Sequence, residues 1–125
     1  MLDPQITHLL ETAINTSCKL AIVLTFMENG SWCATPSEIA ARVCRDIWSV
    51  EEALQELAED GILFARDRRY CYASGTDIRT RLRALQEIYA HPLERNELNS
   101  LVRELERYAP YRKELQLPMI QPRTV

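Results

Sequence analysis

The stretch that decides the fold runs from residue 35 to residue 63 and reads TPSEIAARVCRDIWSVEEALQELAEDGIL. It holds two capping-box signatures, Thr35-Pro36-Ser37-Glu38 and Ser49-Val50-Glu51-Glu52, in which Ser or Thr precedes Glu by three residues. Apolar residues follow each signature at helical spacing: Ile39, Ala40 and Val43, then Val50, Ala53, Leu54 and Leu57. The stretch therefore predicts two short helices joined by a turn at Arg45-Asp46-Ile47-Trp48, with Gly61 closing the second.

A β-hairpin is expected directly after this helix pair. Residues 62–66 and 69–73 are rich in residues that favour strands, and they flank a tight polar turn at Asp67-Arg68. Because the turn is short, the two strands are expected to pair with each other.

Two helices are predicted upstream. Asp3-Pro4 is a typical helix start, and it opens an amphipathic segment. Residues 18–27 are apolar on nearly every side, so we expect a buried central helix, ended by a left-handed cap at Asn29-Gly30. Residues 31–34 are expected to form a short extended connector.

Two more helices are predicted downstream, separated at Pro92 because proline breaks a helix interior. Three further prolines predict a partly extended tail over residues 110–125. The expected fold is mainly α (α+β). Its expected parts are a flanking helix (1–16), a helix-turn-helix and hairpin domain (17–74), two C-terminal helices (75–109) and the tail.

Composition excludes several classes of protein. With 46% hydrophobic and 26% charged residues, 125 residues suffice for one packed domain. There is no apolar run near the roughly 20 residues that span a bilayer, and no signal-peptide pattern, so a cytoplasmic protein without membrane contact is expected. No phosphate-binding loop or nucleophile elbow is present, so no enzymatic activity is expected.

The cysteines and histidines carry no ligand or redox pattern. The four cysteines (Cys18, Cys33, Cys44 and Cys71) are widely spaced without a CxxC pair, which predicts reduced thiols. No Cys or His pair has the spacing of metal ligands, so neither a metal nor another cofactor is expected.

The predicted order of elements over residues 17–74 resembles the winged helix-turn-helix of bacterial transcription regulators of the MarR-like or PadR-like type. The resemblance rests on three stretches, residues 35–40, 49–57 and 60–63. It implies a small β-hairpin wing and flanking N- and C-terminal helices. It also implies binding of double-stranded DNA through the second helix of the pair, the recognition helix, and through the wing.

Basic side chains surround this expected DNA-binding face. Phosphate contacts are expected from Arg42 and Arg45 before the recognition helix and from Arg66, Arg68 and Arg69 around the hairpin turn. Ser49 and Gln55 are the polar side chains expected to read base edges. The alternative for the hairpin is a charged edge that only discourages strand pairing.

The recognition helix itself carries a negative charge, which is unfavourable next to DNA phosphates. The chain carries 15 basic and 18 acidic side chains, net −3, and six of the acids lie between residues 46 and 60 without one Lys or Arg. Glu51 and Glu52 suit the positive end of the helix dipole, which leaves Glu56 and Glu59 unexplained. The alternative function is therefore a protein-interaction module whose contact surface is Trp48, Glu51, Glu52 and Glu56. Trp48 either anchors such a partner or packs over the first helices.

A homodimer is expected from the apolar stripes of the C-terminal helices. These stripes consist of Ile78, Leu82, Leu85 and Tyr89, followed by Leu98, Leu101 and Leu105. They either fold back on the chain's own core or meet a second copy, and the small core favours the second copy. Arg79, Arg81 and Arg83 reach nucleic acid or pair with acids of the first half.

Overall fold

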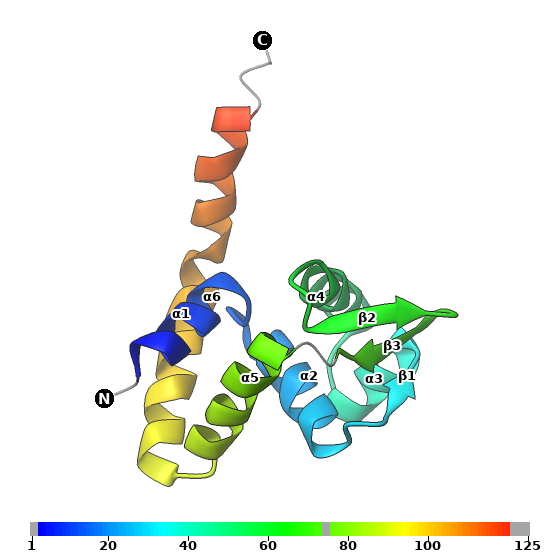
Figure 1. The fold of residues 1–125 in the computed structure, drawn as a ribbon. Coiled ribbons are helices and arrows are strands. Elements are labelled where there is room, and N and C mark those ends of the chain that lie inside the picture. The colour runs from blue at the N-terminus through cyan, green and yellow to red at the C-terminus, as the bar shows by residue number, and fades with distance from the viewer. Residues whose placement is uncertain (1–2, 74–75, 121–125) are drawn as a thin grey trace.

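The computed structural model describes residues 3–73 and 76–120, with side chains over 3–73 and 78–107. Within these ranges the protein is a mostly helical α+β fold with six helices and one three-stranded antiparallel sheet (Figure 1). The helices are α1 (Pro4–Thr12), α2 (Ser17–Glu28), α3 (Pro36–Val43), α4 (Ile47–Glu59), α5 (Thr76–Tyr89) and α6 (Pro92–Ile120). The strands are β1 (Cys33–Ala34), β2 (Leu63–Arg66) and β3 (Arg69–Tyr72).

Two of the predicted helix starts are confirmed. The Asp3 carboxylate accepts a hydrogen bond from the Gln5 amide at 2.8 Å, and Pro4 is the first helical residue. At α3 the capping box is complete, because Thr35 and Glu38 each accept from the backbone amide of the other, at 3.2 and 2.9 Å. These bonds satisfy amides that have no partner inside the helix.

The predicted start of α4 at Ser49 is wrong. The helix begins at Ile47, and its N-cap is Asp46, whose carboxylate accepts from the Ser49 amide at 2.9 Å. A carboxylate at this position both caps the helix and interacts favourably with its dipole, which explains why Asp46 acts in place of Ser49. The turn between α3 and α4 is correspondingly shorter and starts at Cys44, which has a left-handed backbone with φ of 57°.

Of the two helix ends predicted at a glycine, the one at Gly61 is confirmed and the one at Asn29-Gly30 is wrong. Gly61 follows α4 with φ of 80°, a conformation that glycine adopts without strain, and the amide of Ile62 reaches back to the Leu57 carbonyl. The predicted left-handed cap at Asn29-Gly30 is wrong, because Asn29 has φ of −129°. There the chain turns through a bond from the Trp32 amide to the Asn29 carbonyl at 2.9 Å.

The sheet has the strand order β1-β3-β2, so the connector at β1 pairs with the second strand of the predicted hairpin. In the hairpin, Phe64 lies opposite Cys71 and Arg66 lies opposite Arg69. The predicted turn at Asp67-Arg68 is confirmed, and both residues have positive φ, as a two-residue hairpin turn requires.

The core is centred on α2, as its composition predicts. Ile22, Val23 and Phe26 are fully buried, and apolar side chains from every helix join the same cluster. Across the residues that the structure describes, no single helix is long and apolar enough to cross a membrane. Only α1 and α2 taken together reach that composition, and they are bent by 113°.

The stripes of α5 and α6 belong largely to this core. Leu82, Leu85, Leu98 and Leu105 are buried within one chain, so the expectation that they meet a second copy is wrong. The reason is that α1 and α2 cover the same helices: α1 packs against α5, and α2 packs against both α5 and α6. Ile78, Tyr89 and Leu101 are only half-buried.

The predicted separation of α5 from α6 at Pro92 is confirmed, but the predicted extended tail is wrong over residues 110–120. There α6 continues as a helix through Pro110 and Pro118 and extends beyond the rest of the molecule (Figure 1). Good helix formers fill residues 112–117 and favour the helix there, although each proline removes a backbone hydrogen bond and its ring crowds the preceding turn. Residues 121–125 of the predicted tail lie outside the described residues.

Candidate nucleic-acid interface

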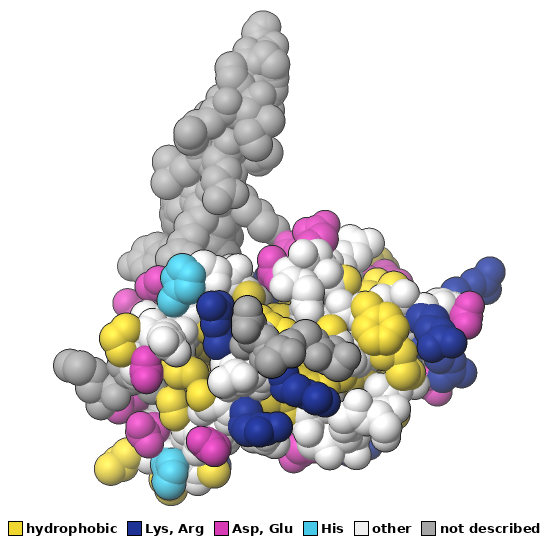
Figure 2. Space-filling view, in the orientation of Figure 1, with side chains coloured by type: hydrophobic (Ala, Val, Ile, Leu, Met, Phe, Trp, Pro, Cys, Tyr) yellow, Lys and Arg dark blue, Asp and Glu magenta, His cyan; other side chains and the backbone are white. Residues whose placement is uncertain are grey.

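The hairpin tip, defined here as Arg66, Asp67 and Arg68, is exposed at the outer end of β2 and β3. Figure 2 shows basic side chains gathered at this outer end. Within the described part of the chain, the guanidinium groups of Arg66 and Arg68 make neither a hydrogen bond nor an ion pair. Two of the three arginines that sequence placed around this turn are therefore presented to solvent together.

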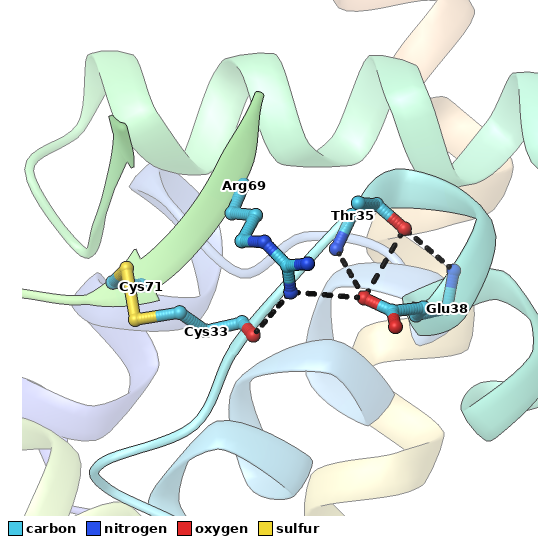
Figure 3. A network of polar contacts seen from close by, with 5 residues as sticks. All are labelled: Cys33, Thr35, Glu38, Arg69 and Cys71. Carbon is cyan, nitrogen blue, oxygen red and sulfur yellow. Dashed lines mark hydrogen bonds and ion pairs between the residues drawn. A yellow bond between two sulfur atoms is a disulfide. The ribbon is translucent and has the colours of Figure 1, made fainter. Parts of the chain in front are cut away.

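Arg69, the third arginine of the predicted phosphate set, is also exposed, but its guanidinium group points toward the start of α3 (Figure 3). Its Nη1 lies 3.5 Å from both the Cys33 carbonyl oxygen and Glu38 Oε1. The pKa of Glu38 lies below its ordinary value, first because the Thr35 backbone amide donates to the carboxylate, with a smaller contribution from Arg69. Arg69 thus connects the start of β3 to the capping box of α3.

A disulfide between Cys33 and Cys71 joins the same two strands, which corrects the expectation of reduced thiols throughout (Figure 3). The antiparallel register places Cys33 directly opposite Cys71, with their Cα atoms 4.4 Å apart. That spacing falls within the range of bonded cysteines. The local hint in the sequence is that both cysteines fall in segments predicted to be extended. Cys18 and Cys44 are free, and burial raises the pKa of the Cys18 thiol.

The outward face of α4, defined here as Trp48, Glu51, Gln55 and Glu59, is exposed along its whole length. The spacing of three, seven and eleven residues from Trp48 places these side chains on one side of the helix. Trp48 is 78% exposed, so the alternative that it packs over the first helices is wrong. Trp32, in contrast, is half-buried and packs against Phe26 in a tilted arrangement with ring centroids 5.0 Å apart.

Glu56 does not belong to this outward face, although sequence placed it there. Its carboxylate forms an ion pair with Lys19 Nζ, and Asn15 Oδ1 accepts from the same ammonium at 3.0 Å. Lys19 is 4% exposed, so this pair holds α4 against the start of α2. The burial of Lys19 was not predictable from α2, which is otherwise almost entirely apolar, because its partner Glu56 lies in α4.

Arg45 and Ser49 lie on the flank of α4 in a polar cleft of about 150 Å³ between α2, α4 and α6. Glu52 and Glu106 line the same cleft. Arg45 donates to the Ser17 hydroxyl at 3.2 Å, and that hydroxyl donates to Glu106 at 3.1 Å.

The residues of the predicted DNA-contact set thus fall into separate places. Arg45 and Ser49 lie in the flank cleft, Gln55 on the outward face, Arg66 and Arg68 at the hairpin tip, and Arg42 on the exposed side of α3.

Comparison with protein-family models, with curated proteins and with solved structures found no match to the chain. The geometry and charge of this chain are therefore the basis for assigning its function. Two features decide it: the basic hairpin tip and the acidic outward face of α4 with its exposed tryptophan.

Proposed function

We propose that residues 17–73 form a winged helix-turn-helix domain that binds double-stranded DNA. The proposal is supported by the element order α2-β1-α3-α4-β2-β3 and by the sheet order β1-β3-β2. It is supported further by the short turn that joins α3 to α4 and by the packing of α4 against β2. A helix and a neighbouring hairpin in this arrangement suit a major groove and an adjacent backbone.

The observation that carries the proposal is the exposed hairpin tip with two arginines that have no partner among the side chains that the structure describes. Phosphate oxygens are the natural partners of guanidinium groups, and phosphate contacts supply most of the affinity of sequence-independent binding. Gln55 on the outward face is the side chain suited to an adenine edge. The carboxylates beside it repel phosphates, so binding is weak, and its salt dependence reflects the small number of phosphate contacts.

The proposal is tested by fluorescence anisotropy with a labelled duplex of mixed sequence at low salt. We expect the wild-type chain to bind and the variant Arg66→Ala/Arg68→Ala to bind at least about tenfold more weakly. The matched control is Arg103→Ala, which removes an exposed arginine from α6 and is expected to change the affinity less than about twofold. Absence of duplex binding at low salt, or equal losses in both variants, contradicts the proposal.

A second candidate function, binding of a basic protein segment, is favoured by the 78% exposure of Trp48. An exposed tryptophan flanked by Glu51, Gln55 and Glu59 suits a partner that offers both Lys or Arg and an apolar side chain. The test is titration with a synthetic amphipathic Lys/Leu peptide. Trp48→Ala is expected to abolish binding, whereas Leu93→Ala, which removes an apolar side chain 79% exposed on α6, is expected to leave it intact. Equal binding by both variants excludes this function.

We also propose that two copies of the chain associate. Among the described side chains of α5 and α6, the half-buried Ile78, Ile88, Tyr89 and Leu101 and the exposed Leu93 are large apolar residues available for such a contact. Sedimentation equilibrium at micromolar concentration tests this, and a monomer throughout the range contradicts it.

A further inference from the structure

A second concave site lies where the sheet leads into α5, at the opposite end of β3 from the hairpin tip. The site, called here the α5 pocket, encloses about 270 Å³ and opens to solvent. Its lining comes from the end of α2 and the residues after it, from the end of β3 and from α5: Met27, Gly30, Tyr72, Arg79, Arg83 and Gln86. Figure 2 shows basic side chains on this face near the middle of the molecule, separate from those of the hairpin tip.

Two arginines dominate the pocket. Arg79 and Arg83 lie one helical turn apart on the same side of α5, where like charges repel each other. Among the described side chains no carboxylate forms an ion pair with either guanidinium. The pocket therefore holds two neighbouring positive charges that the described fold leaves uncompensated.

The remaining polar groups of the pocket are also donors. Tyr72 is half-buried at the end of β3, and burial raises the pKa of its phenol. The charges of Arg79 and Arg83 oppose that rise, and both guanidinium groups belong to residues that line the same pocket as Tyr72. Together with the Gln86 amide, they give a donor set that converges from two elements.

We propose that the α5 pocket binds a small organic anion, a carboxylate or a phosphate monoester with a short apolar body. The two guanidinium groups suit the oxygens of such a group, and the Tyr72 hydroxyl and Gln86 amide donate to it. Met27 supplies an apolar wall for the body of the ligand. A volume near the lower end of that of small-molecule sites restricts the ligand to a compact one.

The position of the pocket lets a bound ligand connect α5 to the sheet. Tyr72 is the last residue of β3, whereas Arg79 and Arg83 belong to α5. An anion bound to all three ties α5 to the base of the hairpin. Ligand binding is measured without DNA, so this inference stands or falls separately from the proposed duplex binding.

The test is isothermal titration of the full chain with benzoate and with phenyl phosphate, in a phosphate-free buffer of low ionic strength. We expect saturable binding of at least one anion and no binding of neutral benzyl alcohol. Tighter binding of benzoate identifies a carboxylate site, and tighter binding of phenyl phosphate identifies a phosphate-monoester site. Backbone NMR shifts are expected at Gly30 and Gln86 and not at Arg68 in the hairpin tip.

Variants locate the binding. Arg79→Gln/Arg83→Gln is expected to weaken binding at least about tenfold, since charged hydrogen bonds are lost from both guanidinium groups. Tyr72→Phe is expected to weaken it about three- to tenfold. The matched control is Arg81→Gln, an exposed arginine of the same helix that does not line the pocket.

Three results overturn the inference. The first is the absence of saturable binding by both anions at millimolar concentration. The second is an equal loss in Arg81→Gln and in Arg79→Gln/Arg83→Gln, which indicates attraction by overall charge. The third is a shift of the Gly30 and Gln86 signals by duplex DNA but not by either anion, which assigns the arginines to nucleic acid. Circular dichroism checks the fold of the double variant, and Arg83→Gln alone replaces it if the fold is lost.

Discussion

The hairpin tip and the outward face of α4 are neighbours with opposite properties. The tip presents Arg66 and Arg68, whereas the outward face presents Glu51 and Glu59 beside an exposed tryptophan. In a helix-turn-helix that binds through its recognition helix, both surfaces carry donors for the duplex. Under the proposed function the two tasks are separated here: the hairpin supplies the positive charge, and α4 limits the affinity and supplies a site for a different kind of contact.

The two regions are also held in place differently. The hairpin is fixed to β1 by the Cys33–Cys71 disulfide and to α3 by the contact between Arg69 and Glu38. In contrast, α4 is held by its apolar side, by the Asp46 cap and by the ion pair between Glu56 and Lys19. The two regions therefore depend on different contacts, although α4 also packs against β2.

The largest effect is expected from the disulfide. It closes a loop with a sequence separation of 38, which corresponds to roughly 4 kcal/mol in a chain-entropy account. We expect Cys71→Ser, or reduction with a dithiol, to lower the free energy of unfolding by about 2–4 kcal/mol in urea titrations. Hydrogen exchange is expected to quicken in β1 and β3 more than in α4.

The exposed Cys44 provides the control, because Cys44→Ser removes a thiol without a bond. It is expected to change the stability by less than about 0.5 kcal/mol. Equal stability of the chain with and without reductant contradicts the assigned role of the disulfide.

The next largest effect is expected on the α4 side. Glu56→Ala removes the carboxylate that pairs with the buried Lys19 ammonium and leaves its hydrogen bond to Asn15, and breaking a buried pair typically costs about 3–5 kcal/mol. Because the Glu56 side chain is 33% exposed, we expect a loss of about 2–3 kcal/mol in chemical denaturation. Glu59→Ala, on the outward face of the same helix, is expected to change stability little. Similar losses in both variants indicate that the ion pair does not hold α4.

A smaller effect is expected when the acidic face is neutralised. If α4 lies near the duplex, Glu51→Gln/Glu59→Gln removes two charges that repel phosphates and strengthens duplex binding about three- to tenfold at low salt. The same variant is expected to weaken binding of the basic peptide. Unchanged duplex affinity places α4 away from the DNA and favours the second candidate function.

The smallest effect is expected in acid. Hydrogen bonds from the Ser49 and Thr35 backbone amides hold the pKa values of Asp46 and Glu38 below their ordinary values of 3.8 and 4.5. Their contribution to stability is therefore complete above those values and lost as the pH falls through the lower folded-state pKa. We expect the melting temperature to fall below about pH 4.5. Asp46→Asn retains a capping side chain but does not titrate, so its fall is expected to be shallower. Identical pH profiles for both chains contradict this role of Asp46.

Local signals predicted much of the fold. Cap residues and apolar spacing identified the Asp3 start, the Thr35 capping box and the break at Pro92, because these features depend on neighbours in the sequence. The start of α4 was misplaced because Asp46 and Ser49 are both good caps three residues apart. Only the hydrogen bond from the Ser49 amide distinguishes them.

Features that depend on distant segments were not predictable in the same way. The apolar stripe of Leu82 and Leu85 indicates burial, but not whether α1 or a second chain covers it. The disulfide requires the pairing of β1 with β3, and the α5 pocket requires Tyr72 to meet Arg79 and Arg83. The acidic character of α4 was evident from its composition. That Glu56 points toward α2 was not, because this depends on its ion pair with Lys19.

The most direct test of the central claim is the salt dependence of duplex binding for the wild-type chain and for Arg66→Ala/Arg68→Ala. Each phosphate contact contributes about 0.9 to the slope of log affinity against log salt concentration. If the hairpin tip carries the phosphate contacts, the variant's slope is shallower by about 2, while Arg103→Ala leaves it unchanged. An unchanged slope in the Arg66→Ala/Arg68→Ala variant contradicts the account.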